Sequence, residues 1–157
     1  MPKVGVVYYS RTGHTEKMAR FVLEGVKREE VEVEIKKVED TKIEDLLGWD
    51  GIIVGSPVYY GIVAAPIKDL FDRSVKYHGR LEGKIGGAFA SSANIGGGNE
   101  TTIFSILQMM LIHGMVVKGS SEGDHYGPVS IGEPDKRVES QCRALGERVA
   151  KLVKRIS

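Results

Sequence analysis

Residues 3–22 read KVGVVYYSRTGHTEKMARFV, and this stretch decides the fold class. Its first part, 3–9, is a continuous apolar run of the kind that forms a strand buried on both faces of a sheet. After it come six small or polar residues, 10–15, which include a glycine and three hydroxyl side chains. The segment 15–28 then places apolar residues at helical spacing. A buried strand, a polar loop and an amphipathic helix in this order predict an α/β protein.

The rest of the chain repeats this alternation. Further strands are expected at 31–36, 51–55, 84–92 and 115–119, and helices over 65–75, 101–114 and the C-terminal segment from Val138 to Ile156. Strict alternation in VEVEIK (31–36) favours a half-exposed edge strand. Together these elements predict one domain, 1–157, with a five-stranded parallel sheet covered by helices on both faces. The one long connection, 119–137, has a length that is typical of functional loops.

The composition excludes several classes of protein. With 41% hydrophobic and 27% charged residues the chain resembles a soluble globular protein, and its net charge of +1 gives no support for a nucleic-acid or membrane-surface partner. Cys142 is the only cysteine, and the four histidines lack metal-ligand spacing, so we expect no disulfide and no metal. No apolar stretch is long enough to cross a bilayer, which makes the cytoplasm the default location. Asparagine and glutamine are scarce beside Glu, Lys and Arg, a bias that suggests a thermophile's protein.

Three loops with unusual chemistry follow the carboxyl ends of predicted strands. They are 10–15 (SRTGHT), 56–61 (SPVYYG) and 92–98 (SANIGGG). Ligands of open parallel sheets bind beyond the carboxyl ends of the strands, where the strand order reverses. We therefore expect the three loops to form one ligand site.

The first loop favours a phosphate group. Free N–H groups at a helix N-terminus attract an anion, Ser10, Thr12 and Thr15 add hydroxyl donors, and Gly13 allows the main chain to curl around the ligand. Neither a Walker ending nor a G-x-G-x-x-G fingerprint is present. The alternative is that Thr15 only caps the helix.

The other two loops suit a planar ring system. Tyr59 and Tyr60 offer aromatic rings, and Gly61 allows a main-chain group to face a ligand, although the two tyrosines are also suited to covering the sheet edge. The glycines 96–98 bring main-chain amides close to a ligand, or else form a flexible turn that Asn99 caps. His125 and Tyr126 in the long loop are candidates to close over the site. No acid–base set is evident, which suits a cofactor that performs the chemistry itself.

Four segments are distinctive in combination: YYSRTGHTEKMARFVLEG, GSPVYYGIVAAPIKDLFD, FASSANIGGGNETTIFS and IHGMVV. Together they resemble the WrbA-type NAD(P)H:quinone oxidoreductases, with a weaker match in HYGPVSIG, and the first segment also resembles the flavodoxin phosphate loop. The resemblance implies a flavodoxin fold, a three-layer α/β/α sandwich with strand order 2-1-3-4-5, that binds FMN non-covalently. The implied cofactor-binding residues are Ser10, Arg11, Thr12, Gly13, His14, Thr15, Pro57, Val58, Tyr59, Tyr60, Gly61, Ser92, Ala93, Asn94, Ile95, Gly96 and Gly97.

The same resemblance implies a catalytic role for His113. The alternative is that His113 lies at the C-terminus of a helix and interacts with free main-chain carbonyls there. His113 matches a family histidine near the flavin's pyrimidine edge, contributed from a neighbouring subunit, so a homodimer or homotetramer is expected. Two features depart from the family: residues 76–78, Lys-Tyr-His, contain no tryptophan near the substrate, and Thr12 replaces a tyrosine that contacts the nicotinamide nucleotide.

The expected function is an FMN-dependent oxidoreductase that passes two electrons from NAD(P)H to a quinone by a ping-pong mechanism. The first alternative is a flavodoxin that carries electrons between protein partners. The net charge of +1 argues against this alternative, because such carriers are usually acidic. A second alternative is a flavin-binding interaction or regulatory module with little turnover.

Overall fold

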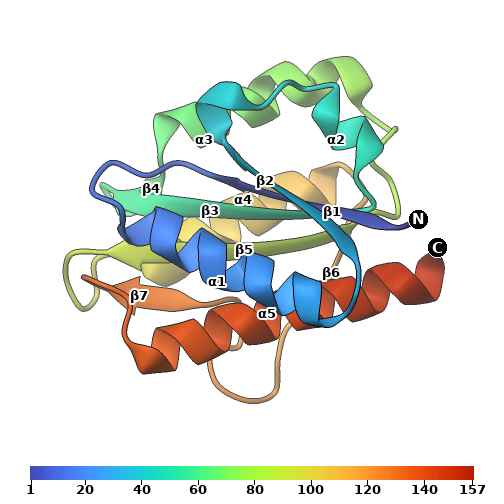
Figure 1. The fold of residues 1–157 in the computed structure, drawn as a ribbon. Coiled ribbons are helices and arrows are strands. Elements are labelled where there is room, and N and C mark those ends of the chain that lie inside the picture. The colour runs from blue at the N-terminus through green and yellow to red at the C-terminus, as the bar shows by residue number, and fades with distance from the viewer.

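The computed structural model describes all residues, 1–157, as one sheet with helices on both sides (Figure 1). The strands are β1 Lys3–Tyr8, β2 Glu32–Lys37, β3 Gly51–Tyr59, β4 Ile62–Val63, β5 Ile85–Ser92, β6 Val116–Val117 and β7 Val129–Ile131. The α-helices are α1 His14–Arg28, α2 Asp45–Gly48, α3 Ala65–Arg73, α4 Asn99–Ile112 and α5 Lys136–Ile156, with short 3-10 turns at Val38–Asp40 and Ser74–Tyr77.

The strands follow the order β2-β1-β3-β5-β6, and every pair along this path is parallel. Since β4 is a short hairpin strand beside β3, this is the expected order 2-1-3-4-5 of the five main strands, and the prediction is confirmed. The edge strand β2 is half-buried along most of its length, as its alternating sequence predicted.

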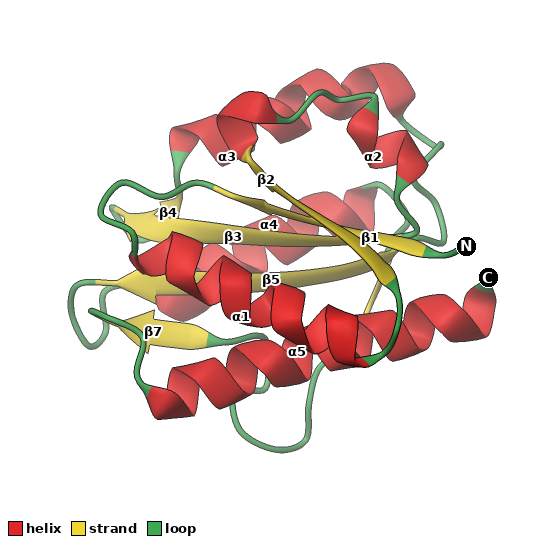
Figure 2. Cartoon of the chain, in the orientation of Figure 1, coloured by secondary structure: helices red, strands yellow, loops and turns green.

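Two separate cores lie on the two faces of the sheet. One contains 17 buried residues from the sheet, α1 and α5, and the other contains 15 from the sheet and the segments α2, α3 and α4. Figure 2 shows α1 and α5 side by side across one face. Because both faces are covered, the inner strands consist largely of apolar and small residues, and all eight residues of β5 are buried.

Strand β3 is longer than the predicted 51–55. It continues to Tyr59 because Ser56 and Pro57 keep their pairing with Ala90 and Ser91 of β5. The chain then reverses at Tyr60 and Gly61 into β4, whose Val63 pairs with Val58. Pro57 is tolerated here because β1 pairs with β3 only as far as Gly55, so that one side of β3 is open at the proline.

The fifth main strand is split in two. Val116–Val117 pair with the first residues of β5, and Val129–Ile131 pair with its last residues. The prediction of one continuous loop over 119–137 is therefore wrong. Residues 118–128 leave the sheet edge as an excursion, and residues 129–131 return to the sheet as β7. Helix α5 then begins at Lys136. A run of three apolar and small residues is too short to be recognised as a strand by its pattern.

Helices α1 and α5 touch through two glycines. A Cβ atom on Gly25 would lie 2.1 Å from the Arg143 carbonyl oxygen, and one on Gly146 would lie 2.2 Å from the Val22 carbonyl oxygen. Such distances leave no space for any side chain. The two glycines therefore allow α1 and α5 to pack with their main chains in contact.

No helix is both long and apolar enough to span a membrane. Figure 1 shows the N- and C-termini near each other, at the end of the sheet opposite the β3–β4 hairpin.

Replacing Gly146 with alanine tests the glycine contact. Alanine normally favours a helix over glycine by roughly 1 kcal/mol, so any destabilisation has to come from the lost space at α1. We expect Gly146→Ala to lower the free energy of unfolding, measured with chemical denaturant, by about 1–3 kcal/mol. Gly48→Ala is the matched control because its Cβ would have no atom within 4 Å; equal stability of the two variants would contradict the prediction.

Candidate functional site

The loop between β1 and α1 presents main-chain N–H groups at a helix N-terminus. Gly13 precedes α1 with a φ of 100°, in the left-handed region that favours glycine. The N–H groups of Arg11, Thr12, His14 and Thr15 have no protein acceptor. The loop is shaped by Ser10, whose Oγ accepts hydrogen bonds from the N–H groups of Gly13 at 3.1 Å and Glu16 at 3.3 Å. Four free donors at a positive helix end make this loop fit an anion.

Thr15 does not cap the helix, so that alternative is wrong. Helix α1 has no side-chain cap, and the Thr15 Oγ1 lies 2.9 Å from the Ser91 Oγ at the end of β5. Thr15 is 2% exposed. The contact places a buried pair of hydroxyl groups behind the free N–H groups and joins the first loop to the strand that leads into the third.

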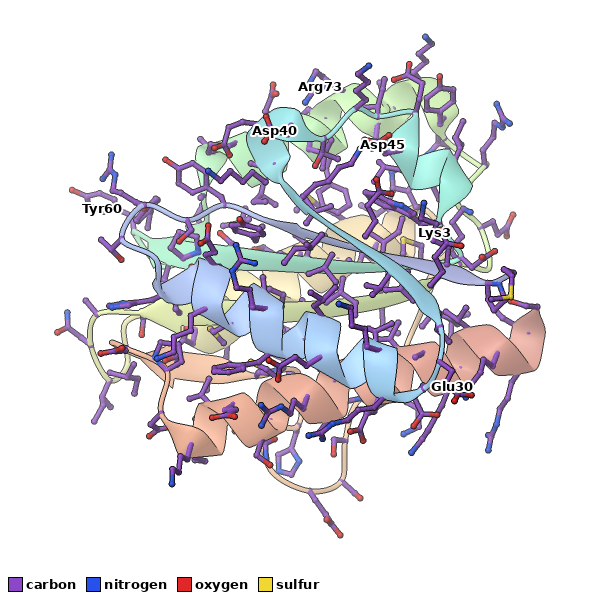
Figure 3. All side chains as sticks on the ribbon, in the orientation of Figure 1. Lys3, Glu30, Asp40, Asp45, Tyr60 and Arg73 are labelled. Atoms are coloured by element: carbon purple, nitrogen blue, oxygen red, sulfur yellow. The ribbon has the colours of Figure 1, made fainter.

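The second loop is a tight hairpin in which the tip residue Tyr60 is fully exposed. Tyr60 has a φ of 52° and Gly61 a φ of 80°, so both central residues are left-handed. Figure 3 shows the Tyr60 side chain at the outer end of the molecule, pointing away from the sheet. Tyr59 is half-buried beside the first loop, where its ring lies 5.6 Å from the Arg11 guanidinium carbon and 6.4 Å from the Tyr9 ring.

The third loop is exposed from Ala93 to Gly97 and is anchored by a buried amide beneath it. The Asn99 Nδ2 donates to the Ser92 Oγ at 2.9 Å and to the Ser130 carbonyl at 3.1 Å, while the Asn99 Oδ1 is buried without a partner. The Asn99 side chain therefore attaches the first residue of α4 to β5 and β7. The residue before the helix is Gly98, which has a φ of 121°. The alternative of a turn that Asn99 caps is therefore wrong.

The second and third loops are in direct contact. A Cβ on Gly98 would lie 2.6 Å from the Gly61 Cα, so only glycine fits between the two loops. The Thr101 hydroxyl donates a hydrogen bond to the Gly61 carbonyl. The three predicted loops thus lie at one edge of the sheet, as the strand registers require, because Tyr8 pairs with Gly55 and Pro57 pairs with Ser91.

A fourth segment at this edge was not predicted. After β7, Gly132 donates its N–H to the Ser92 carbonyl at 2.8 Å, and Glu133 forms an ion pair of 3.2 Å with Lys17 of α1. The only sequence signal for this segment was the short match in HYGPVSIG. Its glycine and glutamate border the first and third loops.

His113 lies away from the three loops of its own chain. It follows the 14-residue helix α4, which begins at the third loop and, at 1.5 Å per residue, is about 20 Å long. The His113 Nε2 lies 2.8 Å from the buried Ser74 Oγ, and its Nδ1 is buried without a partner. The alternative of a bond to free helix carbonyls is therefore wrong, and the catalytic role remains a prediction that requires a neighbouring copy of the chain.

Burial and the nearby His78 ring, 5.8 Å away, both lower the pKa of His113. Burial has the larger effect because it removes water from the charged imidazolium. The histidine belongs to a pocket of about 460 Å³ that also contains Lys68, Phe71 and Asp72.

His125 and Tyr126 belong to the 118–128 excursion and contact its surroundings. The His125 Nδ1 lies 2.9 Å from the Ser120 carbonyl oxygen, and the Tyr126 ring packs on Phe104 of α4 at 4.6 Å. Asp124 holds the excursion to α5 through an ion pair of 2.8 Å with Arg137. In this arrangement the excursion lies along the sheet edge between α4 and α5, and neither residue closes over the three loops.

A wide apolar groove begins at the hairpin and runs along α4. It has a volume of about 900 Å³. Its lining residues are Tyr59, Tyr60, Ile62, Val63, Ala65, Lys68, Ser105, Gln108, Met109, Leu111 and Ile112. No group of His, Cys, Asp and Glu side chains is arranged to hold a metal ion. The edge therefore combines free N–H donors suited to an anion, one exposed and one half-buried tyrosine ring, and an adjoining apolar surface.

Known proteins share both the sequence and the fold. Residues 41–123 match the family described as NADPH-dependent FMN reductase. A protein of Aquifex aeolicus named flavodoxin is 43% identical over 162 residues, which cover 98% of this chain and 88% of that protein. A Bradyrhizobium diazoefficiens protein named NAD(P)H dehydrogenase (quinone) is 40% identical over 145 residues, covering 78% of this chain and 73% of that one. The crystal structure of a flavodoxin, WrbA-like protein from Agrobacterium tumefaciens superimposes with a TM-score of 0.85 at 27% identity, covering both chains completely.

The lowered pKa of His113 predicts how stability depends on pH. In the unfolded chain His113 takes up a proton near its ordinary pKa of 6.5. In the folded chain His113 stays neutral until a lower pH is reached. Stability is thus expected to fall as the pH drops from about 6.5 toward the folded pKa. NMR titration of the ring should show the lowered pKa, and His78→Ala should raise it partway by removing the like charge. A His113 pKa at or above the ordinary value would contradict this account.

Proposed function

The chain belongs to the flavodoxin-like FMN-binding proteins, and from this premise we propose that it carries electrons, as a flavodoxin does, between protein partners. The FMN would be held at the edge where the three loops meet. When bound, FMN supplies the redox chemistry, and the chain's own residues bind it, orient it and control what reaches it.

The first loop fits the phosphate end of FMN. Its four free N–H groups and the Thr15 hydroxyl offer hydrogen bonds to phosphate oxygens, and the helix dipole favours the negative charge. Tyr59 and Tyr60 from the second loop and the glycines of the third loop are the groups that would flank the ring system. The predicted cofactor-binding residues all come from these three loops.

The observation that carries the carrier proposal is the apolar rim around this edge. Tyr60 is fully exposed, Ile95 is 87% exposed and Ile62 is 57% exposed, and each stands at or next to the tip of a cofactor loop. Apolar side chains in such positions suit docking of a partner protein close to the cofactor. The relative from Aquifex aeolicus that carries the name flavodoxin supports the same role.

The net charge of +1 was an argument against a carrier that docks by charge attraction. It is compatible with a carrier whose partner docks mainly through apolar contacts. Near the first loop, Lys17 pairs with Glu133 and Arg20 pairs with Glu16, which leaves Arg11 as the one arginine or lysine of this region without an ion pair. Docking would then depend on the apolar rim and only weakly on long-range attraction.

A second candidate is an NAD(P)H:quinone oxidoreductase. The observation in its favour is the apolar groove of about 900 Å³ that begins at Tyr59 and Tyr60, since a quinone is a flat and largely apolar ring. The relative named NAD(P)H dehydrogenase (quinone) supports it as well. In this candidate His113 acts in a neighbouring copy's site, so the chain has to form a homodimer or homotetramer. A monomer by light scattering, with turnover intact, would exclude that role for His113.

A turnover experiment separates the two candidates. The FMN-loaded protein is mixed with NADPH or NADH and benzoquinone, with free FMN at equal concentration as the control. For a carrier we expect nucleotide oxidation no faster than with free FMN, whereas the chemically reduced protein should pass electrons to cytochrome c. Nucleotide oxidation well above the control, with ping-pong kinetics, would overturn the carrier proposal and support the second candidate.

Replacing Thr15 with valine tests the phosphate site while preserving the side-chain shape. We expect Thr15→Val to weaken FMN binding by about 1–3 kcal/mol, the range for a hydrogen bond to a charged group. Riboflavin, which lacks the phosphate, should bind the variant and the native chain alike.

Ser91→Ala is the control for packing, since it removes the partner of Thr15 but leaves the Thr15 hydroxyl. It should weaken FMN binding less than Thr15→Val does. An unchanged dissociation constant for FMN in Thr15→Val would remove Thr15 from the phosphate site.

A further inference from the structure

We propose that Thr101 is a positioning residue: through its hydrogen bond to the Gly61 carbonyl it fixes the tip of the β3–β4 hairpin in the conformation that meets FMN. The inference rests on the FMN site proposed above. Thr101 lies in the first turn of α4, outside all three predicted loops, so no loop motif identifies it.

The hairpin tip is strained and needs to be held. Tyr60 has a φ of 52°, a region that disfavours residues with a Cβ, and hairpin turns of this kind normally have Asn or Gly at this position. The Tyr60 side chain is fully exposed (Figure 3), so its ring makes no packing contact that repays the strain. Besides the β3–β4 pairing on both sides of the turn, a further restraint comes from the contacts of the neighbouring residue, Gly61.

Gly61 is restrained by α4 in two ways. The Thr101 hydroxyl donates to its carbonyl, and Gly98 packs so closely against it that a Cβ at 98 would lie 3.0 Å from the Gly61 carbonyl oxygen. Both contacts come from the beginning of α4, which Asn99 anchors to β5 and β7. The hairpin tip is thereby attached to the rigid part of the sheet.

The Thr101 hydroxyl has one hydrogen and two acceptors. The Gly98 carbonyl lies 3.0 Å from the same oxygen that donates to the Gly61 carbonyl, and a hydroxyl donates to only one of them at a time. When the hydrogen turns to Gly98, the Gly61 carbonyl loses this restraint and is held only by the packing of Gly98. Thr101 therefore limits how freely the main chain at the hairpin tip moves, and the position of groups beside a flavin ring affects its potential.

The test compares Thr101→Val, which keeps the branched shape and loses the hydroxyl, with Thr101→Ser, which keeps the hydroxyl. Ser140→Ala, which removes an exposed hydroxyl on α5, is the remote control. In the FMN-free protein, amide hydrogen exchange and NMR relaxation of Tyr60 and Gly61 report whether the tip is held. In the FMN-loaded protein, the dissociation constant and the midpoint potentials report the consequence for the cofactor.

We expect Thr101→Val to make the tip mobile, to raise the FMN dissociation constant about two- to tenfold and to shift the potentials, with Thr101→Ser close to the native chain. Unchanged tip dynamics, affinity and potentials in Thr101→Val would overturn the inference while leaving the FMN site intact. Failure of the native chain to bind FMN would instead overturn the proposed function. A general loss of folding in Thr101→Val, visible as a lowered unfolding midpoint with the tip no more mobile than the rest, would also overturn the positioning role.

Discussion

The absence of side chains at Gly25 and Gly146 is the constraint on which the position of the site depends. The two helices α1 and α5 meet there with main-chain atoms in contact, because neither position has space for a Cβ. Helix α1 is thus held close to α5, and its N-terminus with the four free N–H groups is held with it. An anion site at a helix end needs this rigidity, since its donors act together only when the whole helix end is fixed.

Behind the loops, uncharged polar contacts connect segments that are distant in the sequence. The Thr15–Ser91 hydroxyl pair joins the first loop to β5, Asn99 joins α4 to β5 and β7, and Thr101 joins α4 to the hairpin. The hydroxyl pair and the two Asn99 bonds are buried and so protected from competing water, whereas the Thr101 bond to the hairpin is exposed. The exposed loop tips therefore rest on an ordered network, and the apolar groups around the cofactor edge remain available to partners.

The sequence predicted the fold class and the three loops, because these depend on local patterns and on the geometry of parallel sheets. The strand order was expected only from the resemblance to a known family. The sequence did not predict the continuation of β3 through Pro57, since a proline normally argues against an inner strand. The proline is tolerated here because β1 stops pairing with β3 at Gly55. The return of Val129–Ile131 to the sheet, the contact between Gly25 and Gly146 and the buried Asn99 were also missed. Each depends on a partner that is far away along the chain, and a single sequence does not reveal such pairs.

The two ends of the chain lie together at the side of the sheet remote from the cofactor edge (Figure 1). Anything covalently attached there, such as a fused enzyme, a peptide tag or a linker to an electrode surface, would project away from the loops. Two such attachments, one on each end, would also stand next to each other. The chain is therefore suited to being tethered as a module without covering the face at which electrons would enter and leave.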